Sequence, residues 1–482
     1  MALSESARFV TLSVMFDVMR KPVRKVPFAQ HLSPQWLMAL GFLFAILTGT
    51  LLLTLPAANT SGQGLAPVAA LFTATSATCV TGLTVIDIGS ELTRFGQLVV
   101  LALIQLGGLG ITTFGTFLLV IVGRRLSVQS EFVLMNSYGI EEVNSLRSLL
   151  RWTMGLTFLI EGIGAVLLWT RYLIHAPALN LPSDVWTPIY YALFHSVSAF
   201  CNAGFSLHPD NLIPFQNDPF FLGVIDLLII SGGLGFLVLY NLITTKFWRR
   251  NLKTRGRITL HSKIVLIATL LLITVGTVAF LCQEWDNTLK ALPLDGKIVC
   301  SAFHSVTPRT AGFNAVDMGQ IKDTTRFTTS LLMVVGGSPG SSAGGVKTTT
   351  MVVLIMTIVA ICKSRNETVI FSRTIPYTVV REALVIFLLA VSIVLTAFGI
   401  LLWTEAPLKP DDASKLIFET ISAAATVGLS INHTPSLSTA GQCVIIVCMY
   451  VGRLGPLAMA LLVGNRDEGQ RIRYPEEEIV VG

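Results

Sequence analysis

Long apolar runs constrain the fold of this chain more than any other feature. Seven runs of about 20 residues carry few charges, and an eighth is interrupted by the glycine-rich stretch GGSPGSSAGG. A helix of about 20 apolar residues crosses the hydrocarbon core of a bilayer. We therefore predict eight membrane spans, at 36–55, 96–122, 152–171, 220–244, 264–282, 328–361, 383–403 and 442–463.

The composition supports this prediction. Of the 482 residues, 52% are hydrophobic and 13% are charged, whereas a soluble domain carries about 25% charged residues. A disordered chain is excluded because it needs low hydrophobicity and high charge. The seven cysteines are odd in number and show no CxxC spacing, so we expect neither a disulfide framework nor a zinc site. The first 35 residues show no cleavable signal peptide.

The basic residues indicate the orientation. Of the 34 Lys and Arg residues, 23 lie in five of the segments outside the apolar runs. The positive-inside rule makes such segments cytoplasmic, so we expect both termini inside and a multi-pass protein. The net charge of +6 then reflects topology and contact with anionic lipid, and we expect no nucleic-acid partner. The five segments are 1–35, 123–151, 246–263, 362–381 and 464–482.

A repeat is visible between the spans. Four half-apolar stretches, 66–78, 185–200, 292–307 and 413–425, are too short to cross and are predicted to be re-entrant helices on the external side. In each, a Phe precedes a Gly by nine or ten residues; the pairs are Phe72 and Gly82, Phe194 and Gly204, Phe303 and Gly312, and Phe418 and Gly428. The predicted repeats are 36–122, 150–245, 261–361 and 380–463.

Two spans per repeat give every copy the same orientation, so the copies can close into a ring. We predict an all-α polytopic membrane protein with four parallel span–pore helix–filter loop–span repeats and pseudo-fourfold symmetry around a central pore. In such a pore backbone carbonyls replace the hydration shell of an ion, and glycine permits the φ > 0 conformation that tight loops need. No ring of Asp or Glu is visible, which favours a monovalent cation over Ca²⁺ or a transition metal.

The residues around each repeated glycine are the candidate ion-binding residues of a selectivity filter. They are small and mostly neutral, and their carbonyl and hydroxyl oxygens suit a hard cation. The third loop departs from the others by its shorter lead and by Pro308 and Arg309. The candidates are Thr78, Cys79, Val80, Thr81, Gly82, Cys201, Asn202, Ala203, Gly204, Arg309, Thr310, Ala311, Gly312, Thr426, Val427 and Gly428.

The stretch 336–345 is predicted to interrupt its span. Five of its ten residues are Gly and one is Pro, and a helix interior loses about 1 kcal/mol per Gly and about 3 kcal/mol for Pro. Either it is a flexible constriction below the filter, a gate, or it is a kink packed against its neighbours. The candidate gate residues are Gly336, Gly337, Ser338, Pro339, Gly340, Ser341, Ser342, Ala343, Gly344 and Gly345, with Lys347 and Arg453.

Charged residues inside apolar runs are functional candidates by default. Arg453 either places a positive charge below the filter, where it limits cation flux or pairs with the gate loop, or forms a structural ion pair with a neighbouring helix. Glu161 and Asp226 are interpreted as capping or interhelical hydrogen-bonding groups. His195 and His304 occupy matching positions in two re-entrant helices and have no second ligand at metal spacing, so we expect packing or hydrogen bonding there.

The four loops resemble those of a known family. Thr78-Cys-Val-Thr-Gly82-Leu83, Phe200-Cys-Asn-Ala-Gly204-Phe205, Arg309-Thr-Ala-Gly312-Phe313-Asn314 and Thr426-Val-Gly428-Leu429-Ser430 are similar to the filter loops of the Trk/Ktr/HKT superfamily of potassium transporters. The stretch 336–345 and Gly452-Arg453-Leu454-Gly455 also resemble its gate loop and last span. The chain resembles the Ktr branch more closely, because residues 1–35 lack the extra N-terminal spans of bacterial Trk. Some plant HKT proteins that favour sodium have Ser where this chain has Gly82.

The resemblance implies a pore subunit for potassium uptake across the bacterial plasma membrane. It implies K⁺ as the transported ion, a homodimer, and a cytosolic RCK-type nucleotide-binding subunit as regulatory partner. Sodium dependence is known in the Ktr branch and stays open here. No organic cofactor is expected on this chain, which lacks a Rossmann glycine pattern.

Two other function classes are weaker. A multispan membrane enzyme needs converging catalytic groups, and the spans contain no HExxH, GxSxG, Walker A motif or paired carboxylates, so we predict that the chain is not an enzyme. A coupled transporter for an organic solute needs a large polar site and typically inverted repeats, which the sequence does not show.

Overall fold

The computed structural model describes residues 34–109, 145–175, 184, 186–245, 258–407 and 411–455. The predicted cytoplasmic terminal segments, and the ends of two predicted spans at 110–122 and 456–463, lie outside these residues. Within them the regular secondary structure is helical, apart from one small hairpin.

Four helices are long and apolar enough to cross a membrane, among the residues described. Their outward faces are covered with large exposed side chains such as Leu51, Leu270 and Leu395, which suits a helix in contact with lipid. They agree with the spans predicted at 36–55, 152–171, 264–282 and 383–403. The four are α2 (Pro34–Leu53), α7 (Ser145–His175), α11 (Leu260–Glu284) and α15 (Tyr377–Thr404).

Each long helix is followed by a short one of 12 to 15 residues. The first begins at Pro67, where the missing N–H of proline costs nothing because that donor has no intrahelical partner. The short helices confirm the four stretches predicted as too short to cross. They are α3 (Pro67–Thr78), α8 (Trp186–Phe200), α12 (Leu294–Val306) and α16 (Asp412–Ala424).

The helix that completes each unit is short or broken. The prediction of one continuous span at 220–244 is wrong, because Gly235 takes φ 88° and the chain bends by 96° between two helices. The predicted interruption at 336–345 is confirmed, since no helix covers it. These helices are α4 (Arg94–Gly108), α9 (Pro219–Leu234) with α10 (Phe236–Thr244), α13 (Asp323–Val334) with α14 (Thr348–Cys362), and α17 (Thr439–Leu454).

The breaks share a glycine motif that our sequence prediction missed. It reads Gly107-Gly-Leu-Gly110 at the end of α4 and Gly232-Gly-Leu-Gly235 at the end of α9. The third copy begins Gly336-Gly337 after α13, and the fourth reads Gly452-Arg-Leu-Gly455 at the end of α17. Each lies 24 to 28 residues after a repeated loop glycine. Glycine is costly in a helix interior, so the motif marks the place where each helix stops.

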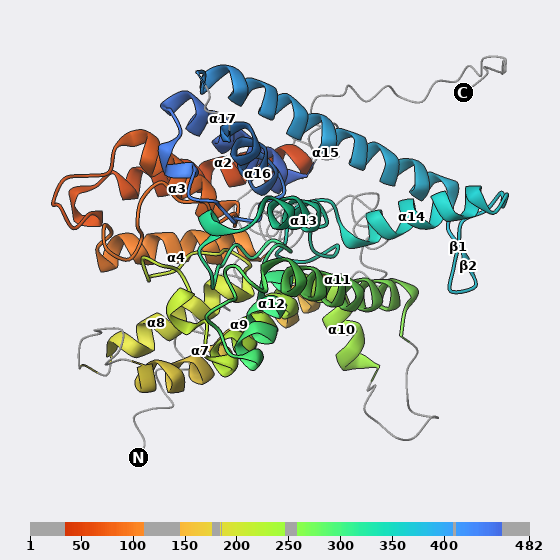
Figure 1. Cartoon of the computed structure of the whole chain (residues 1–482), viewed down its shortest axis with the longest axis horizontal. Helices are drawn as coiled ribbons and strands as arrows, with labels where there is room; N and C mark the ends of the chain where they lie inside the picture. The colour runs from red at the N-terminus through yellow and green to blue at the C-terminus, as the bar shows by residue number, and fades with distance from the viewer. Residues whose placement is uncertain are drawn as a thin grey trace.

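The short helices connect the units into a closed arrangement. Each packs against its own long helix and against the final helix of the preceding unit, in the pairs α8 with α4, α12 with α9, and α16 with α13. The contact of α3 with α17 closes the circle between first and last. Figure 1 shows the same order, with the colour passing around the centre of the molecule from orange through yellow and green to blue.

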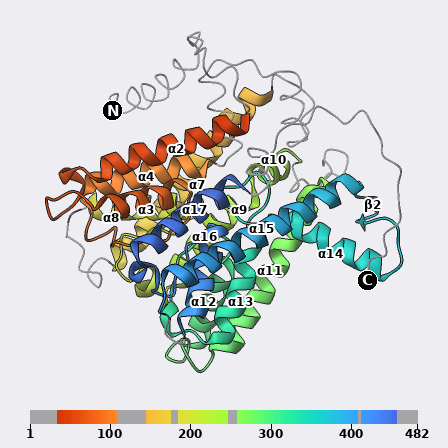
Figure 2. The ribbon, with the colours of Figure 1, turned by 90° about the horizontal axis from the view of Figure 1, so that it is seen from above.

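Helix α14 and the β-hairpin lie at the periphery of the molecule (Figure 2). Figure 2 shows α2 and α4 side by side, whereas α14 and the hairpin project beyond the other helices near α15. The hairpin pairs β1 (Val369–Ile370) with β2 (Arg373–Thr374) in antiparallel register. Ile370 is buried against Ile264, Val353 and Ala383, which fixes it to α11, α14 and α15. Within the described ranges there are also four 3-10 turns: η2 (Pro56–Ala58), η3 (Ile213–Phe215), η4 (Met318–Gln320) and η5 (Thr434–Ser436).

Candidate functional site

The loops that follow the four short helices share one backbone conformation. Each repeated glycine has a positive φ, and so has the residue two positions before it. Side chains other than Gly and Asn rarely adopt this left-handed region, and such residues cluster where the surrounding structure over-determines them. The φ values are 55° at Val80 and 95° at Gly82, 59° at Asn202 and 70° at Gly204, 70° at Thr310 and 81° at Gly312, and 51° at Thr426 and 93° at Gly428.

The four glycines form a ring by contact with one another's loops. A Cβ atom at Gly82 would lie within 3.0 Å of the carbonyl oxygen of Ala203, which precedes Gly204. The same relation holds between each following pair, and Gly428 faces the carbonyl oxygen of Thr81 in the first loop. Each position therefore requires glycine for two reasons: the backbone has a positive φ, and there is no space for a side chain. The successive contacts run from Gly82 to Ala203, Gly204 to Ala311, Gly312 to Val427 and Gly428 to Thr81.

The ring is buried and offers oxygen atoms. The residues from Thr78 to Thr81, from Cys201 to Ala203 and from Arg309 to Ala311 are all at most 5% exposed, as are Thr426 and Val427. The buried hydroxyls of Thr75, Thr78, Thr81 and Thr426 have no hydrogen-bond partner among the described residues. Unpaired buried hydroxyls are costly, so oxygen atoms here are available to a ligand.

The third loop reaches the ring with one residue fewer. In the first loop the N–H of Thr81 donates to the carbonyl of Ser76, five residues earlier, whereas the N–H of Ala311 donates to Thr307, only four residues earlier. The turn of the third loop is therefore one residue tighter, which compensates for the shorter Phe-to-Gly interval. The Arg309 guanidinium donates to the Thr269 hydroxyl of α11 at 3.2 Å, so its side chain is directed toward that helix.

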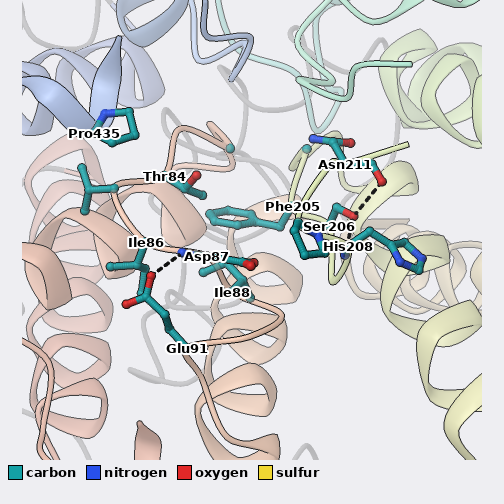
Figure 3. A pocket seen from close by; sticks show the side chains of 14 residues that line it. Thr84, Ile86, Asp87, Ile88, Glu91, Phe205, Ser206, His208, Asn211 and Pro435 are labelled. Carbon is teal, nitrogen blue, oxygen red and sulfur yellow. Dashed lines mark hydrogen bonds between the residues drawn. The ribbon is translucent and has the colours of Figure 1, made fainter. Parts of the chain in front are cut away.

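A vestibule of about 350 Å³ lies against Gly82 and Gly204. Figure 3 shows Asp87 and Glu91 on one side and Ser206, His208 and Asn211 on the other. The Glu91 carboxylate accepts the Asp87 N–H at 2.9 Å. Burial lowers the pKa of His208 to about 4, so the imidazole is neutral near pH 7. The carboxylates are therefore the charged groups among the lining residues.

The stretch 336–345 lies against the breaks of the neighbouring helices. The N–H of Ser338 donates to the carbonyl of Gly233 at 3.0 Å, and the N–H of Phe236 donates to that of Gly340 at 3.0 Å. A Cβ at Gly344 would meet the hydroxyl of Thr426 in the fourth loop. The stretch therefore contacts both the bend of α9 and the ring.

Arg453 occupies the second glycine position of the fourth motif. It is 2% exposed, and its guanidinium donates to the carbonyls of Ser342 and Gly107. Neither partner is a carboxylate, and the ion pair considered as an alternative is not found among the described residues. Lys347 donates to the carbonyl of Ala343 at 2.7 Å. Both cations therefore hold the stretch by its backbone.

The other polar residues form hydrogen bonds behind the loops. Glu161 accepts from Gln105 at 3.2 Å, which confirms an interhelical role, whereas Asp226 Oδ1 has no partner among the described residues. The His195 ring lies 3.0 Å from the Ser206 hydroxyl, and His304 accepts the N–H of Ala315 at 3.3 Å. Both histidines therefore form hydrogen bonds, one of the two roles predicted, and these partners lie in the segment beyond their glycine.

The sequence prediction missed the equivalent residue of the fourth copy. Glu419 follows Phe418 as His195 follows Phe194. Its fully buried carboxylate accepts from Ser430 at 2.6 Å, Ile431 at 3.1 Å and Thr434 at 2.6 Å. Alignment of the four copies would have identified it.

One acidic residue outside the spans anchors the broken helix α9. Asp218 accepts the N–H groups of Phe220 and Phe221 and a two-point hydrogen bond from Arg171. Burial opposes its ionisation, but the Arg171 hydrogen bonds and the other donors outweigh burial. The pKa of Asp218 is therefore lowered below its ordinary value of 3.8.

Comparison with known proteins identifies the family. Residues 30–468 match the model of the TrkH family, described as cation transport protein. The chain belongs to this family. The predicted membership of the Trk/Ktr/HKT superfamily is thereby confirmed, and so is the prediction that the chain is a transporter and not an enzyme.

Relatives extend over almost the whole of this TrkH-family chain. It is 38% identical to the Ktr system potassium uptake protein B of Bacillus subtilis over 93% of this chain and 97% of that protein. It is 37% identical to the potassium/sodium uptake protein NtpJ of Enterococcus hirae over 96% of this chain and 100% of that protein. The crystal structure of the potassium transporter TrkH from Vibrio parahaemolyticus matches with a TM-score of 0.68 and 17% identity, over 90% of this chain and 86% of that one; this likeness concerns the fold.

Proposed function

We propose that this protein is the ion-conducting subunit of a potassium uptake system. In this proposal the units are four parallel repeats with pseudo-fourfold symmetry, and their loops form the selectivity filter. The filter residues are those predicted from the sequence, from Thr78 to Gly82, Cys201 to Gly204, Arg309 to Gly312, and Thr426 to Gly428.

The closed chain of contacts among the four glycines supports the proposal most strongly. Four loops far apart in sequence meet through one repeated contact, in which a glycine faces the carbonyl before the next glycine. Such a ring gives an ion several equivalent backbone oxygens, and carbonyl rings of this kind replace the hydration shell of K⁺. The unpaired threonine hydroxyls add further oxygen atoms.

The names of the relatives support K⁺ as the ion. The Bacillus protein is a potassium uptake protein, and the Enterococcus protein is a potassium/sodium uptake protein, so sodium is a second cation to test. The Asp87 and Glu91 carboxylates give the vestibule a negative wall, which raises the local concentration of cations.

The stretch 336–345 is proposed as the gate. Arg453 donates both to the Ser342 carbonyl of this stretch and to the Gly107 carbonyl at the end of α4, and so links the two. Lys347 donates to the Ala343 carbonyl of the same stretch. A loop that is held at a helix break by a few buried hydrogen bonds can move between two arrangements, because those bonds can be exchanged for others.

The proposal extends to the cellular setting. We propose a homodimer in the bacterial plasma membrane with both termini in the cytoplasm, where a nucleotide-binding RCK-type subunit would control the gate. The Bacillus relative is named as part of a Ktr system, which supports a partner subunit.

The test is ⁸⁶Rb⁺ uptake by the purified protein in liposomes, with K⁺ and Na⁺ as competitors. Gly82→Ser, Gly204→Ser, Gly312→Ser and Gly428→Ser should each reduce K⁺ over Na⁺ preference by about ten-fold or more, because the added side chain would collide with a carbonyl oxygen of the neighbouring loop, and overpacking of this kind costs about 1–3 kcal/mol. Gly62→Ser is the control, since Gly62 has φ 70° but no neighbour within 4 Å. Unchanged flux and preference in all four variants would refute the filter.

A further inference from the structure

A second repeated residue lies four positions after the phenylalanine of each short helix. It is Ser76, Ser198, Thr307 or Ser422, so all four copies carry a hydroxyl. All four side chains are fully buried. A buried hydroxyl requires a hydrogen-bond partner, and the partners of these four are alike.

Each of the four hydroxyls bonds to its own loop at the repeated glycine. Ser76 accepts the N–H of Gly82 at 3.0 Å, and Ser422 accepts the N–H of Gly428 at 3.1 Å. Ser198 donates to the carbonyl of Phe205 at 2.8 Å, and Thr307 donates to that of Phe313 at 2.6 Å. The bond therefore fixes the glycine N–H in the first and fourth copies and the next carbonyl in the second and third.

Neighbouring hydroxyls in the same helices behave differently. A Ser or Thr within a helix commonly bonds back to the carbonyl four residues earlier, as Thr420 does to Leu416 at 2.6 Å. Ser196 donates across to the carbonyl of Glu161 in α7 at 2.6 Å. Among the serine and threonine hydroxyls described in α8 and α16, only those of Ser198 and Ser422, two residues further along, bond to the loop that follows their helix.

We propose that Ser76, Ser198, Thr307 and Ser422 are positioning residues that hold the four glycine loops at the separation K⁺ requires. The proposal rests on the filter assignment above. The hydroxyls do not touch the ion; they fix the backbone atoms on either side of each glycine, and thereby determine the preference for K⁺ over Na⁺.

The two kinds of bond predict an order of effects. Buried N–H groups left unpaired are rarer in proteins than under-satisfied carbonyls, which have two lone pairs. Removal of the hydroxyl at Ser76 or Ser422 leaves a glycine N–H without its acceptor, so these two positions are more sensitive than Ser198 and Thr307.

The experiment compares matched pairs within one helix. Ser422→Ala is set against Thr420→Val in α16, and Ser198→Ala against Ser196→Ala in α8. The readout is ⁸⁶Rb⁺ uptake in liposomes under K⁺ or Na⁺ competition, with thermal unfolding and elution volume measured for every variant. Ser422→Ala should lose about ten-fold of the K⁺ over Na⁺ preference, Ser198→Ala less, and the two controls none.

Conservative variants separate positioning from folding. Ser422→Thr should retain the preference, because Thr307 shows that threonine is accepted at this position. Ser422→Cys keeps a similar volume but offers a weak acceptor, so it should lose preference even if Ser422→Ala does not fold.

Gly428→Ser distinguishes the two levels of the proposal. If Gly428→Ser loses preference while Ser422→Ala and Ser422→Cys match Thr420→Val, the role of the hydroxyls is refuted and the filter stands. If Gly428→Ser also leaves the preference unchanged, the filter is refuted and the positioning role with it.

Discussion

The molecule has two sets of repeated glycines, and the four copies agree more strictly in one than in the other. The first set is the ring of loop glycines; the second is the layer of glycine motifs that ends α4, α9, α13 and α17. In the ring every copy has the same glycine, the same left-handed φ and the same neighbour contact. In the second layer two copies retain Gly-Gly-Leu-Gly, one opens into the loop 336–345, and one carries Arg453. Ion coordination needs equivalent ligands, whereas a gate needs an element with two arrangements.

Packing explains which glycine of the motif is constant. A Cβ at Gly107, Gly232 or Gly452 would collide with the carbonyl oxygen of Thr78, Phe200 or Ala424, at the end of the short helix of the same unit. The neighbours of the second position differ between copies. A Cβ at Gly233 would be 3.5 Å from the Asn202 amide, whereas one at Gly108 would collide with Cys201 and one at Gly337 with Ala343. The first glycine therefore makes the same close packing contact in these three copies, whereas the second has different neighbours in each and is replaced by Arg453 in the fourth.

Arg453→Gly gives the fourth copy the Gly-Gly-Leu-Gly motif of the first two, and it should have the largest effect. The variant removes two charge-assisted hydrogen bonds that hold the loop, to Ser342 and Gly107, and such bonds are worth about 1.5–3 kcal/mol each. Unstimulated ⁸⁶Rb⁺ flux should rise by at least about ten-fold, and deletion of 338–344 should raise it similarly.

Arg453→Lys is the control for charge. It retains the positive charge but lacks the planar fork that reaches two acceptors, so flux should fall between wild type and Arg453→Gly. Flux that stays at the wild-type level in both Arg453→Gly and the deletion would contradict the gate.

Gly232→Ala tests the constant half of the motif. Because the added methyl group would collide with the Phe200 carbonyl, the variant should lower the free energy of unfolding by roughly 1–3 kcal/mol. Gly223→Ala, in the same helix with nothing within 4 Å, should be neutral or raise stability by about 0.5–1 kcal/mol. Equal melting temperatures of the two variants in detergent would rule out the packing explanation.

Asp218→Asn tests whether the N-terminal end of α9 is independent of the break at its other end, Gly235. This variant should have the smallest effect of those considered. The pKa of Asp218 is lowered in the folded protein, so its stabilisation is complete above the ordinary value of 3.8 and is lost as the pH falls through the folded pKa. The melting temperature should be lower than wild type at pH 7, and the difference should shrink as pH falls below about 4. A change in K⁺ over Na⁺ preference would show that the two ends are coupled.

The sequence predicted the parts of the fold that depend on local spacing. The Phe-to-Gly interval located all four short helices and their loops, because each short helix and its turn lie within 16 to 19 consecutive residues. The predicted continuous span at 220–244 was wrong, since mean hydropathy does not register a bend at Gly235. The recurring Gly-Gly pairs were readable but were obscured by the apolar runs that contain them.

Long-range contacts were beyond reach of the sequence. Arg453 was identified as a buried charge, but its two carbonyl partners are 111 and 346 residues away. Which loop adjoins which glycine also depends on the packing of four units. Glu419 could have been found from its place after Phe418, and was missed because a carboxylate does not resemble the two histidines.

Anomalous diffraction from crystals grown in Rb⁺ tests the filter most directly. A carbonyl ring selective for K⁺ should also hold Rb⁺, so a peak is predicted on the axis of the four loops, within coordination distance of backbone oxygens from Thr81, Ala203, Ala311 and Val427 or their neighbours. The peak should weaken in Gly312→Ser. Rb⁺ transport by the same protein without a peak at this ring, or with its ordered Rb⁺ elsewhere, would contradict the proposal.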